Sequence, residues 1–271
     1  MKSKFIKVAG YDLHYRVKGS GKNMVLLHGG LTSSNYWKET IEHFSKIFKV
    51  YALDLPGFGL SDKPNIGYSI PEQSKFVDGF LDSLNIEKPI LMGHSYGGSI
   101  AVQLAANKPE KFKALIAIEP VCKPVRKKRL FSILSAPGIK NILHSLKVLE
   151  LGCWIKYLFA KSEEKLKCLT YFKDIQKMSK YASFGSLKEI TKINLEDELK
   201  KIKIPSLFVW GDNKKSVVGL PPKGLKKFTM IENAGHNLIH EKFEAFKNSL
   251  THFLSCQSAI PFLRQDNQVT S

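Results

Sequence analysis

The chain has 271 residues, of which 43% are hydrophobic and 24% are charged, and its formal net charge is +18. This length suffices for one α/β domain with an insertion or for two small domains. The chain has no run of about 18 apolar residues, which argues against a membrane-spanning helix. Its first ten residues also lack the apolar core of a secretion signal, so we expect a soluble, cytoplasmic protein.

The positive charge is concentrated in the middle of the chain. Residues 122–203 contain 19 Lys and Arg residues against 8 Asp and Glu residues. Lysine predominates, and no aromatic residues alternate with the basic ones as they do in nucleic-acid sites, so we do not expect nucleic-acid binding. Transient contact with an anionic membrane surface stays open, as does a basic surface that only faces solvent.

The first half of the chain alternates strand-like and helix-like segments. Segments 4–8 and 12–17 alternate apolar and polar residues around Ala9-Gly10, which predicts a β-hairpin. Apolar runs then predict buried strands at 24–28, 49–55, 90–93 and 113–119, with helices at 36–47, at 71–84 and directly after residue 94. This alternation predicts an α/β fold with a mostly parallel, doubly wound sheet.

The pattern changes at residue 122, because residues 122–200 contain no convincing buried strand. Apolar helical faces from Ile139 to Leu149 and from Trp154 to Phe159 predict an inserted α-helical cap, where they line an acyl pocket or pack internally. A strand is expected again at 206–211, then a last strand with its loop within 227–236 and a helix at 239–254. The predicted organisation is a core of residues 1–121 and 204–255, a cap of residues 122–203 and a loosely ordered tail of residues 256–271.

Residues 89–98, PILMGHSYGG, place Gly-x-Ser-x-Gly between a buried strand and a helix. A serine on such a sharp turn has a strained backbone, and a side chain at Gly93 or Gly97 would clash with the neighbouring strand or helix. The turn exposes the Ser95 hydroxyl near a helix N-terminus, where free N–H groups stabilise negative charge. The motif alone is also compatible with a plain glycine-rich turn. Whether Ser95 is a nucleophile therefore depends on finding its catalytic partners elsewhere in the sequence.

Among the 8 histidines, His236 is the candidate base for Ser95, because it follows the last predicted strand in a Gly-containing loop. A serine in mid-chain with its histidine near the end also fits the hydrolase order of Ser, acid and His. The other histidines are interpreted as structural; His94 adjoins the serine and is expected to point away from it, and His28 is expected to support its loop.

An oxyanion hole is the second requirement of a serine nucleophile. The N–H of Tyr96 follows the nucleophile at the helix start and is one candidate donor. The loop after the strand at 24–28 offers the other, through Gly30 or Leu31. A simple turn that ends the strand explains His28-Gly29-Gly30 as well.

Four motifs together resemble the α/β-hydrolase superfamily, in its branch of esterases, lipases and dehalogenase-like enzymes with a helical cap. They are HGG at 28–30, DLPGFGLSD at 54–62, GHSYGG at 93–98 and NAGH at 233–236, and the resemblance covers residues 5–255. It implies a catalytic triad at the carboxyl edge of the sheet, while the motifs specify the substrate poorly.

The acid of the triad departs from the usual pattern of this family. The resemblance implies an acid three residues after the glycine that ends the seventh strand, Gly211, but that position is Lys214. Glu119 is one replacement, because a minority branch of the family places a catalytic glutamate at the end of the sixth strand. Asp212, reached by a shifted loop, is the other. If neither serves, Glu119 pairs with a lysine such as Lys123 and the triad is degraded.

The nucleophile restricts the chemistry that the resemblance implies. Dehalogenases and epoxide hydrolases of this fold use aspartate at the elbow, whereas Ser95 suits hydrolysis of a carboxylic ester through an acyl-enzyme. We expect a small ester with an apolar acyl group as substrate, no cofactor and no metal, and free thiols at all 4 cysteines. The alternatives are a C–C bond hydrolase or lysophospholipase of the same fold, a catalytically weak ligand-binding or receptor-like member, and a peripheral membrane-binding module.

Overall fold

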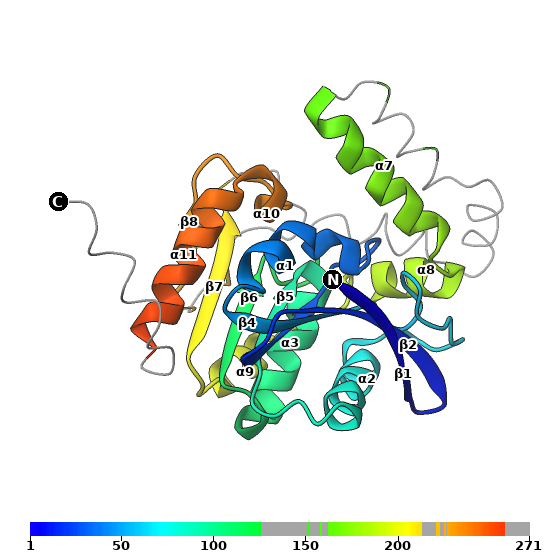
Figure 1. Ribbon diagram of the computed structural model, residues 1–271, viewed down its shortest axis with the longest axis horizontal. Helices are drawn as coiled ribbons and strands as arrows, with labels where there is room; N and C mark the ends of the chain where they lie inside the picture. The colour runs from blue at the N-terminus through cyan, green and yellow to red at the C-terminus, as the bar shows by residue number, and fades with distance from the viewer. Residues whose placement is uncertain are drawn as a thin grey trace.

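The computed structural model describes residues 1–125, 162–212 and 227–257, with the single positions 151, 158, 221, 222 and 225; the side chains of residues 162–168 lie outside this description. Eight strands form one sheet in the order β1-β2-β4-β3-β5-β6-β7-β8 (Figure 1). They are β1 (Lys2–Val8), β2 (Tyr11–Lys18), β3 (Lys22–Leu27), β4 (Phe48–Leu53), β5 (Ile90–His94), β6 (Ala114–Ile118), β7 (Ser206–Gly211) and β8 (Thr229–Ile231).

The pairing confirms the predicted fold class. β1 pairs with β2, and β2 with β4, in the antiparallel direction, while the pairs from β4 through β3 to β8 are parallel. The predicted hairpin therefore exists, and its strands lie at one edge of the sheet. A mostly parallel sheet aligns the carboxyl ends of its strands along one edge, where ligands bind in folds of this type.

Helices cover both faces of the sheet (Figure 1). Successive side chains of β3 alternate between two hydrophobic clusters, with Val25 and Leu27 in one and Met24 and Leu26 in the other. The first cluster includes residues of α2 (Ile70–Ser83) and α3 (Ser95–Asn107), and the second includes residues of α1 (Lys38–Phe44) and α11 (Phe243–Cys256). Burial on both faces explains why the central strands are continuous apolar runs in the sequence.

Two predicted helices differ from the structure. The helix expected over 36–47 is a 3₁₀ turn, η1 (Ser34–Trp37), followed by the short α1. The last helix is divided into α10 (Leu238–Glu241) and α11 at Lys242, whose φ of −142° and ψ of 52° are not helical. The last strand and loop expected within 227–236 are present, with the strand limited to the three residues of β8. A second 3₁₀ turn, η2 (Pro109–Lys111), follows α3.

Between β6 and β7 the described elements are helices, namely α7 (Ser162–Gln176), α8 (Lys180–Glu189) and α9 (Glu196–Lys201). α9 packs against α3. The first apolar face of the predicted cap lies outside the described residues, and of the second only Leu158 is described, with 66% of it exposed. The boundaries of the cap and of the tail therefore stay predictions. None of the helices in the described part of the chain is both long and apolar enough to cross a membrane.

Candidate active site

Ser95 lies where β5 ends and α3 begins. Its φ of +53° is in the left-handed region, which side chains other than glycine rarely adopt. A Cβ added at Gly93 would come within 2.2 Å of the carbonyl oxygen of Gly97, and one added at Gly97 within 2.3 Å of the carbonyl oxygen of His28. Both positions therefore require glycine, for the steric reason that the sequence motif predicts.

Three side chains from different strand ends meet at the carboxyl edge of the sheet. Ser95 follows β5, Glu119 follows β6, and His236 follows β8. Nε2 of His236 lies 3.0 Å from Oγ of Ser95, and Nδ1 of His236 lies 3.0 Å from Oε2 of Glu119. Both ring nitrogens of His236 are thus engaged. Asp212, which follows β7, is exposed, so the structure brings Glu119 rather than Asp212 to the histidine.

Glu119 is completely buried, and the fold supplies the partners that a buried carboxylate needs. Its Oε1 accepts the backbone N–H of Gly211 at 2.7 Å, while Oε2 faces His236. Lys123 instead pairs with Glu196 at 2.5 Å, so the alternative in which Lys123 holds Glu119 is wrong. Lys214, at the position where most of the family has its acid, lies outside the described residues.

His94 has a contact that the sequence does not reveal. Its Nε2 lies 2.8 Å from the carbonyl oxygen of His236. Burial, with the neighbouring His236, holds the pKa of His94 well below its usual value, so the ring is neutral and its Nε2–H donates to that carbonyl. The ring stacks on Tyr36, with centroids 4.6 Å apart. His94 thereby fixes the backbone that carries the candidate base.

The loop after β3 passes directly beside the serine. A Cβ added at Gly29 would lie 3.3 Å from Cβ of Ser95, and one added at Gly30 would lie 3.9 Å from Cβ of Tyr96. Gly30 and Tyr96 are therefore neighbours, as a shared oxyanion hole requires. Leu31 has a φ of +63°, so the chain turns sharply after Gly30. The roles of these N–H groups stay predictions.

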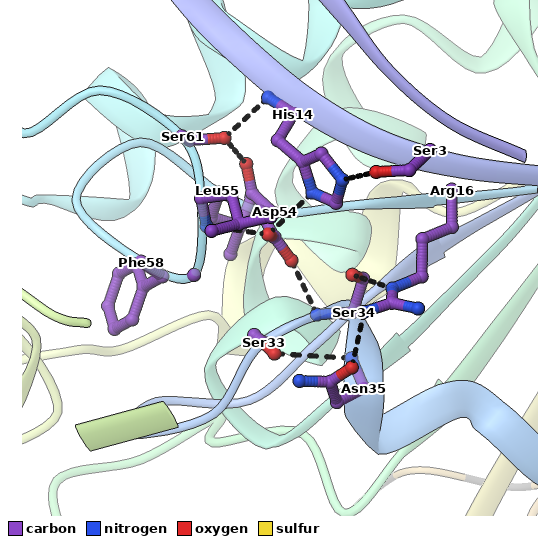
Figure 2. Close-up of polar contacts among 12 residues, drawn as sticks. Ser3, His14, Arg16, Ser33, Ser34, Asn35, Asp54, Leu55, Phe58 and Ser61 are labelled. Carbon is purple, nitrogen blue, oxygen red and sulfur yellow. Dashed lines mark hydrogen bonds and ion pairs between the residues drawn. The ribbon is translucent and has the colours of Figure 1, made fainter. Parts of the chain in front are cut away.

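The carboxylate of Asp54, at the end of β4, anchors this loop (Figure 2). Its Oδ1 accepts the N–H of Ser34 at 2.6 Å, and its Oδ2 accepts from Nδ1 of His14 at 2.7 Å and from the N–H of Leu60 at 2.8 Å. Burial opposes ionisation, but these hydrogen bonds and the nearby His28 hold the pKa of Asp54 at about 2. The DLPGFGLSD motif does not reveal this role; the available signal was a charged residue at the end of an apolar run, which needs partners when buried.

Comparisons with known proteins agree with this fold. Residues 22–243 match the family model described as alpha/beta hydrolase fold. The chain belongs to the α/β-hydrolase family. It is 33% identical over 208 residues to the pimeloyl-[acyl-carrier protein] methyl ester esterase of Wigglesworthia glossinidia brevipalpis, which covers 73% of this chain and 77% of that protein.

Two further relatives of this α/β-hydrolase extend the comparison. The haloalkane dehalogenase of Agrobacterium fabrum is 32% identical over 116 residues, which cover 43% of this chain and 38% of that protein. The chain thus matches about two fifths of the length of this dehalogenase. The enol-lactonase of Burkholderia xenovorans LB400 superimposes with a TM-score of 0.78 at 22% identity, over 93% of this chain and 100% of that one, and shows the shared fold.

Neither a metal site nor a reactive cysteine emerges from the part of this hydrolase that the structure describes. Within these residues, no three His, Cys, Asp or Glu side chains are grouped as metal ligands. Cys122 and Cys256 are free thiols, as expected, while the side chains of Cys153 and Cys168 lie outside the description. Burial raises the pKa of Cys122 to about 12, so it stays an unreactive thiol.

Proposed function

We propose that this α/β-hydrolase is a serine hydrolase that cleaves carboxylic esters through an acyl-enzyme. The observation that carries the proposal is the line of contacts from Ser95 Oγ through His236 to Glu119, with 3.0 Å at each step. A carboxylate only accepts hydrogen bonds, so Nδ1 of His236 carries the proton and its Nε2 is free to accept one. This is the protonation state that a general base for a serine requires.

In the first step, Oγ of Ser95 attacks the ester carbonyl carbon while its proton passes to Nε2 of His236. Glu119 stabilises the imidazolium that forms, and because the carboxylate is buried its charge acts with little screening by water. The N–H groups of Gly30 and Tyr96 hold the oxyanion of the tetrahedral intermediate. His236 then gives the proton to the leaving alcohol, and the acyl group stays on Ser95.

In the second step, a water molecule replaces the alcohol. His236 takes a proton from this water, hydroxide attacks the acyl carbon, and the acid is released as His236 returns the proton to Oγ of Ser95. With 25% of its side chain exposed, His236 can be reached by the water molecule that this step consumes.

An ester is favoured over the other substrates of this fold for two reasons. Serine at the elbow forms an acyl-enzyme that water can hydrolyse, and the relative matched over 208 residues is named as a methyl ester esterase. The case for a catalytically weak binding protein depended on a missing acid, and Glu119 supplies a carboxylate to His236. A C–C bond hydrolase or lysophospholipase would use the same residues on another leaving group.

Intact-mass labelling with an alkyl fluorophosphonate, together with turnover of p-nitrophenyl esters of increasing acyl length, tests the proposal. We expect rapid incorporation of one phosphonyl group at Ser95, and ester turnover that Ser95→Ala abolishes. Vinylogous diketones and lysophospholipids, offered in parallel, identify the two alternative reactions. Absence of Ser95 labelling at high reagent concentration would contradict a hydrolase mechanism and favour a binding protein.

A further inference from the structure

A second serine–histidine–carboxylate arrangement joins the β1–β2 hairpin, at the opposite edge of the sheet from β8, to Asp54 after β4 (Figure 2). Oγ of Ser3 lies 2.6 Å from Nε2 of His14, and Nδ1 of His14 lies 2.7 Å from Oδ2 of Asp54. Both distances are shorter than the corresponding ones around His236. Ser3 is exposed on an edge strand, whereas the side chains of His14 and Asp54 are 0% and 2% exposed.

The protonation of this group follows from its partners. Asp54 is ionised at neutral pH, because its hydrogen bonds hold its pKa at about 2, and a carboxylate can only accept. Nδ1 of His14 therefore carries a proton in either charge state of the ring. When the ring is neutral, Nε2 has a free lone pair, and the hydroxyl of Ser3 donates to it. The burial of His14 and Asp54 holds the imidazole in this orientation.

A cavity borders two of the residues that lie next to Ser3. Ser3 pairs with Arg16 in the antiparallel register, so the two side chains lie on the same face of the sheet, and Met1 shares that face by alternation. Met1 and Arg16 both line a cavity of about 630 Å³, together with Lys38, Lys173 and Lys177. Glu39 and Asp174 also line it, so four basic side chains face two acidic ones, and this excess of positive charge favours donors that carry a negative charge.

Backbone N–H groups at the edge of the sheet also lie close to Ser3 in sequence. β1 is an edge strand, so alternate backbone N–H groups face away from β2. The outward-facing groups of β1 are either the N–H of Ser3 or the N–H groups of its neighbours Lys2 and Lys4. A serine hydroxyl that donates to an imidazole, which a buried carboxylate in turn orients, has the nucleophile–base–orienter contacts of an activated nucleophile.

We infer that Ser3 is a second activated nucleophile, which accepts acyl or phosphonyl groups from activated esters independently of Ser95. Oγ of Ser3 forms a bond to the carbonyl carbon, and its proton passes to Nε2 of His14. The bond to the leaving alcohol then breaks, and the alcohol takes the proton from His14, which leaves acyl-Ser3. With a fluorophosphonate, fluoride leaves instead and His14 releases the proton to water.

The test uses the full-length Ser95→Ala variant, in which the first nucleophile is absent. The protein is treated with an alkyl fluorophosphonate, and adducts are located by peptide mass spectrometry. Ser20 is the matched control, because it is an exposed serine in the connection between β2 and β3 and the same peptide map reports its labelling. We expect Ser3 to react about 100-fold faster than Ser20, the size of a typical general-base contribution. Ser3→Ala should remove this adduct.

A His14→Gln substitution in the same background identifies the base, and should reduce Ser3 labelling to the rate of Ser20. Thermal melting shows whether that variant is folded; if it is not, the comparison of Ser3 with Ser20 in the Ser95→Ala protein decides. Equal rates at Ser3 and Ser20, or fast Ser3 labelling that persists in folded His14→Gln, would overturn the inference. Because Ser95 is absent throughout, neither result depends on the proposed esterase activity.

Discussion

Ser95 and Glu119 both have left-handed backbones, with φ values of +53° and +46°. Such conformations cost about 1–3 kcal/mol each for residues other than glycine, and they persist only where the surrounding structure enforces them. Here each one follows the last residue of a buried strand and directs its side chain toward His236. Both residues that must face the histidine from adjacent strands therefore carry backbone strain.

Substitution of the two candidate acids, Glu119 and Asp212, should affect activity very differently. In Glu119→Gln the amide oxygen still accepts the N–H of Gly211, so the fold should hold, but the amide NH₂ then faces Nδ1 of His236. The imidazole adopts the other tautomer, with its proton on Nε2, and cannot accept from Ser95. We expect kcat/KM for a p-nitrophenyl ester to fall about 10³–10⁴-fold, as when other triads lose their acid.

Asp212→Asn is the control for this substitution. Asp212 is exposed and His236 has no free ring nitrogen for it, so its kcat/KM should stay within about twofold of the wild type. A loss in Asp212→Asn comparable with that in Glu119→Gln would show that the working enzyme uses the acid after β7.

At the scale of elements, the elbow depends on close approach of β3, β5 and α3. In Gly97→Ala the new methyl group would meet backbone, 2.3 Å from the carbonyl oxygen of His28, so strand and helix must separate. We expect a loss of about 3 kcal/mol in the free energy of unfolding, measured by urea denaturation. Gly10→Ala is the control: its φ of +86° is unfavourable, but no atom lies within 4 Å, so it should cost about 1–2 kcal/mol. Similar losses in both variants would contradict a steric origin.

The carboxylate of Asp54 joins β2, β4 and the loop after β3. The free energy of unfolding should therefore depend on pH in the range where Asp54 titrates. Its pKa of about 2 in the folded state lies below the ordinary value of 3.8. The stabilisation is therefore complete above about pH 4 and is lost as the pH falls through 2, with a maximum of about 2 kcal/mol. Urea unfolding of the wild type and of Asp54→Asn at pH 6, 4 and 2 should show their difference shrinking by this amount. A difference that is independent of pH would contradict the assignment.

The elements that the sequence predicts best are those whose burial is uniform. β3, β4, β5 and β6 are continuous apolar runs because both faces of each are covered, and their positions follow directly from that pattern. The division between α10 and α11 could not be predicted, because Lys242 carries no local signal for its non-helical backbone.

The candidate site shows the same limit. The elbow is a local motif, so Ser95 follows from a few consecutive residues. Glu119 and Asp212 each follow a strand, and distance along the chain cannot decide between them. The sheet order decides: β6 adjoins β5, so Glu119 lies beside the serine strand, and the N–H of Gly211 on β7 holds its second oxygen. The contact of His94 with the backbone of His236 likewise joins residues far apart in the sequence, so it could not be predicted from a local motif.

At the scale of the whole molecule, a net charge of +18 remains after the candidate site has been assigned. Much of it lies in residues 122–203, the segment predicted to form the cap, so we propose that this segment makes reversible contact with anionic lipid. Such attraction is screened over about 10 Å at 0.1 M salt and over about 3 Å at 1 M. Binding to vesicles that contain phosphatidylserine should therefore be strong at 20 mM salt and largely lost at 300 mM.

Binding is measured by sedimenting the vesicles and determining how much protein sediments with them. Vesicles of phosphatidylcholine alone are the control, and they should bind little protein at either salt concentration. Equal binding to both kinds of vesicle would point to an apolar contact instead of a charged one. If neither kind of vesicle binds the protein at 20 mM salt, the proposed contact with anionic lipid is wrong. Screening by salt could not explain that result, because the screening length at this ionic strength is longer than the few ångströms between a docked lysine and a lipid headgroup.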